Sequence, residues 1–445
     1  MTRKTWVLVI ASILVSVILI EGQVFATDEE ERKKIVVFQR GTSSAVQRQV
    51  VTLSGSTVVH SLSFIDALAI KLPVRNLDRA LAFLLDYTVL GVHPVVGVYD
   101  DLVVSVLPIT LAPLEEVPLQ ETYGWGLEHI HVDEAHRMSE ATGSEVKVAV
   151  VDTGVDCGHP DLRLFIEGFN ALPDGRSFCD NHGHGTHMAG IIAAIKDNVV
   201  REGIIGAAPR ALLVAVKVLD AKGKGYLSDL INGLEWIWTY NNQNKKQIRI
   251  VNMSLGFTTD SSPLRTAIKK LFKDHGTIMV ASAGNSCSDS GGQEEAGGDE
   301  DQRAACDGPQ TTTVKYPGAY PEVLAVTATD DNDQLTSYSL EGPAVDVTAP
   351  GGSGDCESTE RTERTKCILS TYLYGDYGYG KGTSQAAAHV TGALALKLQL
   401  QPDLTLEKVR CLLQETATPL KGDPRKTQQG WGLIDAALLL ETTCP

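Results

Sequence analysis

The sequence predicts an α/β protein in which helices cover both faces of a parallel sheet, preceded by a small ferredoxin-like α+β domain. From residue 146 onward, nearly continuous apolar runs of strand length alternate with helix-length segments, which is typical of parallel sheets covered on both faces. Before that point, about 75 residues follow the order β-α-β-β-α-β of a ferredoxin-like plait. At 445 residues, the chain is long enough to bury a sizeable core.

The small domain is expected to have its core at about residues 34–107. Its expected strands are 35–38, 56–62, 67–72 and an alternating apolar stretch at 95–107, and its expected helices are 45–52 and 76–85. The next segment, residues 107–120, is rich in Pro and Leu and has no regular pattern. It is interpreted as a linker.

The larger domain should contain at least five strands and five helices. The expected strands are 146–151, 212–218, 248–253, 277–282 and 323–327, and the expected helices are 185–196, 227–241, 263–274, 383–400 and 405–415. Ligands bind beyond the carboxyl ends of the strands in such sheets. Asp152 directly follows one strand and Asn285 follows another, so both are expected at the same edge.

Composition and charge exclude some classes of protein. The hydrophobic content of 43% is that of a soluble globular chain. The formal net charge of −16 provides no basic surplus to displace counterions, which argues against a nucleic-acid partner.

The N-terminus has the pattern of an export signal. Arg3 and Lys4 precede a mostly apolar run at 6–20, and residues 24–26 offer a cleavage point. The run is shorter than the ~20 residues of a membrane span. We therefore predict a signal peptide at 1–26, a secreted, extracellular product and no membrane span after its removal. An uncleaved anchor is the alternative, and retention at the cell envelope stays open.

The cysteine count fits an exported protein. All eight cysteines follow residue 156, at positions 157, 179, 287, 306, 356, 367, 411 and 444. An even number in an exported chain indicates disulfides, although eight cysteines allow 105 pairings. Pairing of sequence neighbours (157–179, 287–306, 356–367 and 411–444) is the simplest hypothesis. No two cysteines have the close Cys-x-x-Cys spacing of a zinc ribbon, so a structural zinc is not expected.

Three motifs together indicate nucleophilic catalysis. Ser384 lies between small residues at the start of an apolar helical run, Asp152 lies in an Asp-Thr-Gly sequence at a strand end, and His184 lies in His-Gly-Thr-His. Separately, the serine could be a helix N-cap and the aspartate a turn residue. Together they supply a nucleophile, a base with a pKa near neutrality and a carboxylate.

These segments, in the chain order Asp…His…Ser, resemble the subtilisin (subtilase) family of serine endopeptidases. The resemblance covers roughly residues 115–440, with a recognisable propeptide before it. It implies that Asp152 orients the imidazole, His184 is the general base and Ser384 is the nucleophile. Because the first histidine of His-Gly-Thr-His is the family's catalytic one, the motif selects His184. Asn285, in Ala-Ser-Ala-Gly-Asn, would stabilise the oxyanion together with the backbone N–H of Ser384.

The resemblance also implies where substrate binds. Ser254, Leu255 and Gly256 would pair with an extended peptide and line the pocket for the residue before the scissile bond. A cis peptide bond is expected before Pro317 in a nearby turn.

The resemblance further implies a self-processing zymogen. The expected divisions are a signal at 1–26, a propeptide at 27–112 and a peptidase domain at 113–445. The propeptide would act as an intramolecular chaperone and inhibitor, and the connector at 107–120 would be cut. Partners would be protein or peptide substrates, the enzyme a monomer, and catalysis would need no cofactor.

Two other classes of protein are alternatives. His182, His184 and His187 have a spacing used by zinc hydrolases, but Thr186 stands where that pattern has an aspartate. His182 is instead expected on the surface and His187 packed in its helix. A catalytically dead binding protein is the second alternative, and the intact Asp152, His184, Asn285 and Ser384 argue against it.

Some positions depart from the family or carry open interpretations. Gln385 and Ala388 replace the usual methionine and proline. The acidic stretch between Cys287 and Cys306 is either a solvated loop, a calcium site or a rim that attracts basic substrate residues. Asp161 and Asp197 occupy places where the family binds structural Ca²⁺, but the adjoining loop departs from the family pattern, so the metal ligands remain unknown.

Overall fold

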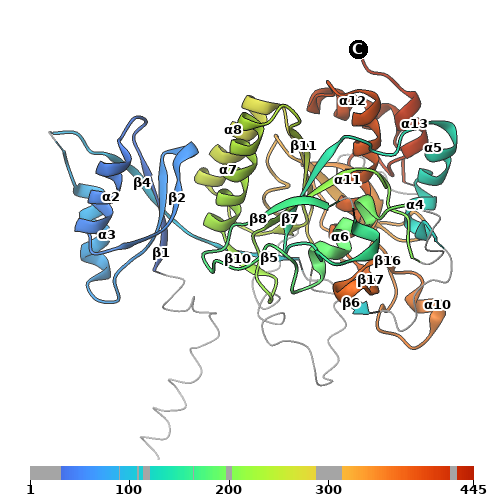
Figure 1. The fold of residues 1–445 in the computed structure, drawn as a ribbon, viewed down its shortest axis with the longest axis horizontal. Helices are drawn as coiled ribbons and strands as arrows, with labels where there is room; N and C mark the ends of the chain where they lie inside the picture. Colours follow the sequence, from blue (N-terminus) through green and yellow to red (C-terminus); the bar gives the residue numbers. More distant parts are fainter. Residues whose placement is uncertain are drawn as a thin grey trace, which may run out of the picture.

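The computed structural model describes residues 32–89, 91–107, 110–113, 121–163, 165–196, 203–286, 313–420 and 428–445. Two units lie side by side, a small unit of residues 32–100 and a large unit from residue 121 onward (Figure 1). The predicted signal peptide, Asp197 and the acidic stretch between Cys287 and Cys306 lie outside the described residues. No helix in the described ranges is long and apolar enough to cross a bilayer.

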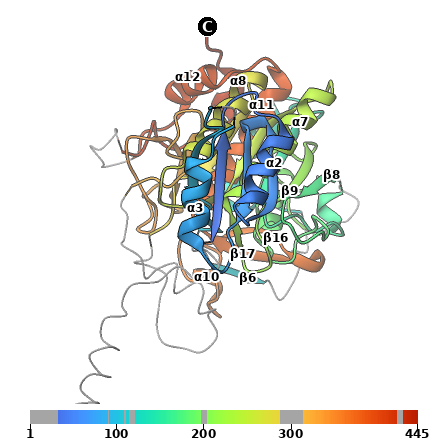
Figure 2. The same ribbon diagram turned by 90° about the vertical axis from the view of Figure 1, so that its left-hand side faces the viewer.

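The small unit has the predicted plait. Its sheet order is β2-β3-β1-β4, and all neighbours are antiparallel. Figure 2 shows α2 and α3 on the side of this sheet that faces away from the large unit. The bounds are β1 Lys33–Phe38, α2 Ser44–Leu53, β2 Thr57–Leu62, β3 Ala67–Lys71, α3 Leu77–Asp86 and β4 Val95–Asp100.

Both faces of the small sheet are buried. Because side chains alternate along a strand, Val36 packs under the two helices while its neighbour Ile35 packs against the large unit. Phe64 lies against Trp238 with ring centroids 6.1 Å apart. The small unit therefore shares an apolar core with the helices α7 (Leu227–Gln243) and α8 (Ser262–His275) of the large unit (Figure 1).

The large unit contains the predicted parallel sheet, with seven strands in the order β15-β14-β13-β11-β7-β9-β8. Every pairing is parallel. One core lies between this sheet and α6 with α11, and a second between the sheet and α7 with α8. The strands are β7 Lys147–Asp152, β8 Phe165–Asn170, β9 Leu212–Lys217, β11 Ile248–Met253, β13 Ile278–Ser282, β14 Leu324–Thr329 and β15 Val345–Pro350.

The predicted helices are present, with ends shifted by a few residues. Short helices and strands that the sequence did not indicate complete the unit. The remaining elements are α4 Gly124–His129, α5 Val132–Met138, α6 His184–Ala193, β10 Lys224–Tyr226, β12 Leu255–Gly256, α10 Arg361–Arg364, β16 Ile368–Thr371, β17 Tyr377–Lys381, α11 Thr383–Leu400, α12 Leu406–Thr416 and α13 Ala436–Glu441.

Two expectations about the connection between the units were wrong. The stretch 95–107 is not one strand, because β4 ends at Asp100 and a separate strand, β5 (Val103–Val106), leaves the small unit. β5 lies between β10 and β12 in an antiparallel three-stranded sheet. The supposed linker also contains a strand, β6 (Thr110–Pro113), which pairs with β17.

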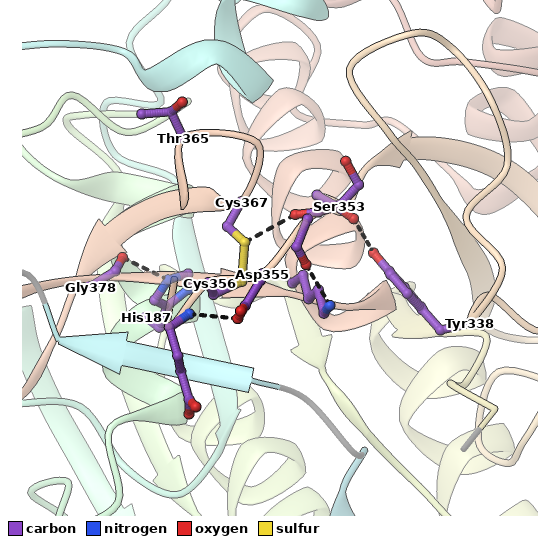
Figure 3. Close-up of a disulfide and its surroundings, with 12 residues drawn as sticks. His187, Tyr338, Ser353, Asp355, Cys356, Thr365, Cys367 and Gly378 are labelled. Atoms are coloured by element: carbon purple, nitrogen blue, oxygen red, sulfur yellow. Dashed lines mark hydrogen bonds between the residues drawn. A yellow bond between two sulfur atoms is a disulfide. The ribbon is translucent and has the colours of Figure 1, made fainter. Parts of the chain in front are cut away.

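Three of the four hypothesised disulfides are confirmed: Cys157–Cys179, Cys356–Cys367 and Cys411–Cys444. Cys287 and Cys306 fall outside the described residues. Figure 3 shows the Cys356–Cys367 bridge, whose Cys367 Sγ lies 3.1 Å from the carbonyl oxygen of Ser353. The Tyr316–Pro317 peptide bond is cis, as expected.

Candidate active site

Asp152 and His184 form a buried hydrogen-bonded pair. Asp152 is the last residue of β7, and His184 is the first residue of α6. His184 Nδ1 lies 2.7 Å from Asp152 Oδ1, and neither side chain is exposed. The same carboxylate oxygen accepts the N–H of Thr153 at 2.7 Å. The aspartate therefore fixes the orientation of the imidazole ring, and Nε2 is the ring nitrogen that is not bound to the carboxylate.

A close backbone approach holds this pair together. A Cβ on Gly185 would lie 2.0 Å from the carbonyl oxygen of Gly154, so only glycine fits there. The Gly185 N–H donates to Thr153 Oγ1 at 2.9 Å. The first turn of α6 is thus fixed against the loop that follows β7.

Lys217, at the end of β9, is a neighbour that the sequence analysis missed. Its Nζ donates to the carbonyl oxygens of Thr153 and Leu219, at 2.5 and 2.7 Å, and to Asn181 Oδ1 at 2.9 Å. Burial lowers its pKa. The ammonium joins the loops on either side of the Asp152–His184 pair. A lysine in an apolar strand gives no such signal by itself.

Ser384 lies in the first turn of α11, at the end of the chain segment that follows β17. Its N–H is one of the amides that a helix N-terminus leaves without an intrahelical acceptor. Ser384 Oγ donates to the carbonyl oxygen of Ser254 at 3.4 Å, and Ser254 Oγ donates to the carbonyl oxygen of Ser384 at 3.1 Å. The serine therefore lies directly against the strand end that was predicted to bind substrate.

Asn285 follows β13, at the same edge as Asp152, as predicted. Its Oδ1 accepts hydrogen bonds from Thr383 N at 3.0 Å and Thr383 Oγ1 at 2.8 Å. The carbonyl side of the amide is therefore engaged, which leaves Nδ2 as the donor side. Only 3% of the residue is exposed.

His184 and Ser384 are not hydrogen-bonded to each other. His184 Nε2 and Asp152 Oδ2 are both buried without a partner, and the serine hydroxyl is turned toward Ser254. Such catalytic contacts are often long before substrate binds. The buried lone nitrogen is available to accept a proton.

The three histidines do not converge. His187 Nε2 lies 3.2 Å from the carbonyl oxygen of Gly378 in β17 (Figure 3), and its buried ring packs in α6 as expected. His182, expected at the surface, is partly buried, and its Nε2 is 3.0 Å from the position of a Cβ on Gly223. Burial lowers the pKa of both side chains, that of His187 to about 3.

Asp161 is satisfied by protein donors. Its Oδ2 accepts from Tyr377 Oη at 2.7 Å and from Ile204 N at 3.1 Å. The described ranges contain no cluster of three or more side chains suited to hold a metal. Asp197, in the loop considered for the other calcium ligands, lies outside the described residues.

Gln385 fills the position next to the nucleophile. Its side chain is fully buried, and neither Nε2 nor Oε1 has a hydrogen-bond partner. Its Nε2 would lie 2.7 Å from a Cβ on Gly380, which places the amide under β17. The departure from methionine thus puts a buried polar group beside the serine.

Known proteins resemble this chain over most of its length. The family model described as Subtilase family matches residues 143–432. Subtilisin E of Bacillus subtilis is 32% identical over 435 residues, which cover 94% of this chain and 95% of that protein. Subtilisin of Bacillus pumilus is 38% identical over 297 residues, 66% of this chain and 92% of that protein. A thermostable alkaline protease of Halalkalibacterium halodurans is 36% identical over 321 residues, 72% and 74% of the two chains.

The fold and these matches define the class of the protein as a serine endopeptidase, a hydrolase of peptide bonds. The chain belongs to the subtilase family.

Proposed function

We propose that this chain is a secreted, self-processing endopeptidase that works through an Asp152–His184–Ser384 triad and an acyl-enzyme intermediate. The observation that carries the proposal is the position of two strands that follow the small unit, β5 (Val103–Val106) and β6 (Thr110–Pro113). β5 pairs with β12, which adjoins Ser384, and β6 pairs with β17, which leads into α11. These pairings support the proposal that β5 and β6 occupy the position of an extended substrate on either side of the nucleophile.

The geometry supports a definite sequence of proton transfers. His184 Nε2 accepts the hydroxyl proton as Ser384 Oγ attacks the carbonyl carbon, and then gives it to the leaving amine. Asp152, bound to Nδ1 at 2.7 Å, stabilises the imidazolium. Asn285 Nδ2 and the Ser384 N–H donate to the oxyanion. Water then releases the acyl group by the same steps in reverse.

The small unit is proposed to be a propeptide within residues 27–112, followed by the peptidase at 113–445. It shares a core with α7 and α8 and sends β5 into the substrate position, so it can both assist folding and block the site. Export through residues 1–26, action on protein substrates and a monomeric state are part of this proposal, and a structural Ca²⁺ without a catalytic role is compatible with it.

The reaction class is tested by labelling. A fluorophosphonate should modify Ser384 and abolish casein digestion, whereas a chelator should leave digestion unchanged. Loss of activity with the chelator, without labelling of Ser384, would refute the serine mechanism and return the metal class to consideration.

Replacing Asn285 with alanine is expected to lower kcat by about 10²–10³-fold, the loss measured for the oxyanion-hole asparagine of a subtilisin. KM should change little, because the Asn285 amide stabilises the negative charge that develops on the substrate's carbonyl oxygen only after the substrate has bound. Steady-state kinetics on a peptide substrate measure both constants. Asn242→Ala, at an exposed position of α7, is the control. An equal loss in both variants, or a loss confined to KM, would contradict the role.

Attachment of the small unit is expected to weaken as the pH rises from about 4 to about 7. Asp101 Oδ1 and Oδ2 accept from Ser228 N and Oγ, each at 2.7 Å. Burial raises the pKa of Asp101 from 3.8 to about 6. A raised pKa favours the protonated, attached state, so this contribution is full below pH 3.8 and is lost as the pH rises through 6. It amounts to about 3 kcal/mol.

Thermal unfolding of an uncut Ser384→Ala precursor across this pH range measures the effect. Asp101→Asn should flatten the pH dependence, because the amide does not titrate. An identical pH profile in the two proteins would show that Asp101 is not the responsible group.

A further inference from the structure

Lys315 borders the pocket that holds the side chain of Leu107. A Cβ on Gly256 would lie 3.1 Å from Leu107 Cδ2 and 3.3 Å from Lys315 Cβ. A Cβ on Gly284 would lie 3.0 and 3.2 Å from Lys315 Cγ and Cδ. The lysine stem therefore runs along the pocket wall from Gly256 to Gly284, the residue before Asn285. Leu107 itself is 1% exposed.

The register identifies which pocket this is. Ser105 is paired with Gly256 and Val106 with Leu255, so the next residue, Leu107, falls opposite Ser254. Ser254 is hydrogen-bonded to Ser384 in both directions. Given the proposed function, a substrate residue bound in this place is the one whose carbonyl is attacked. Its pocket selects the residue before the scissile bond.

The backbone of Lys315 is hydrogen-bonded, and among the described residues its ammonium has no counter-charge. Lys315 N donates to the carbonyl oxygen of Ala283 at 2.8 Å. Among the described residues its ammonium has no hydrogen bond or ion pair. Burial alone lowers its pKa. A partly desolvated cation without a partner is costly, and the apolar Leu107 does not relieve that cost.

We propose that Lys315 makes this enzyme select an acidic residue, glutamate in particular, before the scissile bond. Besides Lys315, the nearest side chain to Gly284 is the apolar Leu340, whose Cδ1 would lie 2.7 Å from a Cβ there, so the ammonium is the charged group that borders this wall among the described residues. A carboxylate in the pocket would supply the missing counter-charge, and glutamate has the longer reach. This preference is opposite in sign to the basic preference considered for the acidic stretch between Cys287 and Cys306. The inference rests on the proposed function and names its substrate class.

Two peptides that differ only in charge test the selection. Fluorogenic peptides with the sequence Val-Val-Ser-Val-Xaa, taken from residues 103–106, carry Glu or its isostere Gln at Xaa, with Leu and Lys as further members. For the wild-type enzyme, expressed from its full precursor, kcat/KM for Glu should exceed that for Gln by at least about 10-fold. Lys315→Met should bring this ratio to about one. Lys315→Glu should make the Lys peptide better than the Gln peptide.

Controls distinguish a failure of the acidic preference from a failure of the proposed endopeptidase function. Lys269→Met changes a half-exposed lysine of α8 and should leave the Glu/Gln ratio at its wild-type value. Cleavage of the Leu peptide by every variant shows that each one folds and acts. A wild-type ratio near one, or a ratio that survives Lys315→Met, would overturn the acidic preference alone. Failure of the wild-type enzyme to cleave any of the peptides, without fluorophosphonate labelling, would overturn the proposed function and the preference with it.

Discussion

Replacing Ser384 with alanine is expected to lower kcat for peptide hydrolysis by about 10⁶-fold, the scale measured when a subtilisin loses its nucleophile. The oxygen that forms the acyl bond is removed, and the neighbouring hydroxyl of Ser254 donates instead to the carbonyl oxygen of residue 384. Release of a fluorogenic peptide, measured with the purified and folded protein, gives the residual rate. Because substrate binding and the oxyanion donors remain, the variant should still hydrolyse the peptide faster than the uncatalysed reaction in water.

The same variant tests self-processing. Wild type should yield a product whose N-terminus lies beyond the small unit, whereas Ser384→Ala should remain a full-length precursor. Ser262→Ala, an exposed serine at the start of α8, is the matched control and should mature normally. Normal trimming of Ser384→Ala in a host without other subtilases would contradict self-cleavage, and an unchanged rate of casein digestion would contradict the nucleophile.

Replacing Asp152 with asparagine is expected to lower kcat by about 10⁴-fold. The shape of the site is retained, but the amide can donate to His184 Nδ1, which places the ring proton on Nε2. That nitrogen can then no longer accept the proton of Ser384. The kinetic constants, together with the rate of fluorophosphonate labelling, report the loss of nucleophile activation.

Asp274→Asn provides the comparison, because it neutralises a carboxylate at the far end of α8 that pairs with Lys270 on the surface. It should keep the wild-type rate. A loss of less than about tenfold in Asp152→Asn would mean that the Nδ1 contact does not set the tautomer of the base.

The sequence predicted those strands of the large sheet that form nearly continuous apolar runs. β7, β9, β11, β13 and β14 are apolar along their length because both faces of the sheet are covered, and this makes them visible in the sequence. β8 was missed because it is an edge strand interrupted by Glu167 and Gly168. β15 was missed because Asp346 interrupts its apolar run, and that carboxylate pairs with Arg410 of α12.

The candidate site also contains residues that the sequence predicted and residues that it missed. The four predicted catalytic residues each lie near the end or start of a helix or strand, within a short motif that can be recognised from the sequence alone. They are Asp152, His184, Asn285 and Ser384. The structure brings Asp152 to His184, Thr383 to Asn285 and Ser384 to Ser254. The course of β5 and β6 could not be predicted, because their partners β10, β12 and β17 lie more than a hundred residues further along the chain. Lys217 and Lys315 were missed because no local sequence pattern marks a lysine whose contacts, such as those with Thr153 and Gly256, come from other segments of the chain.

The two-sided burial of the small sheet decides the fate of the small unit after activation. One face of that sheet, with Ile35, Leu62 and Phe64, is covered only while α7 and α8 are in place, and none of the eight cysteines lies in this unit. A fragment of this size that loses half its apolar cover has little left to keep it folded. If the proposed self-processing cuts the small unit free, we expect it to unfold and become a substrate of the enzyme, so that activation would be irreversible.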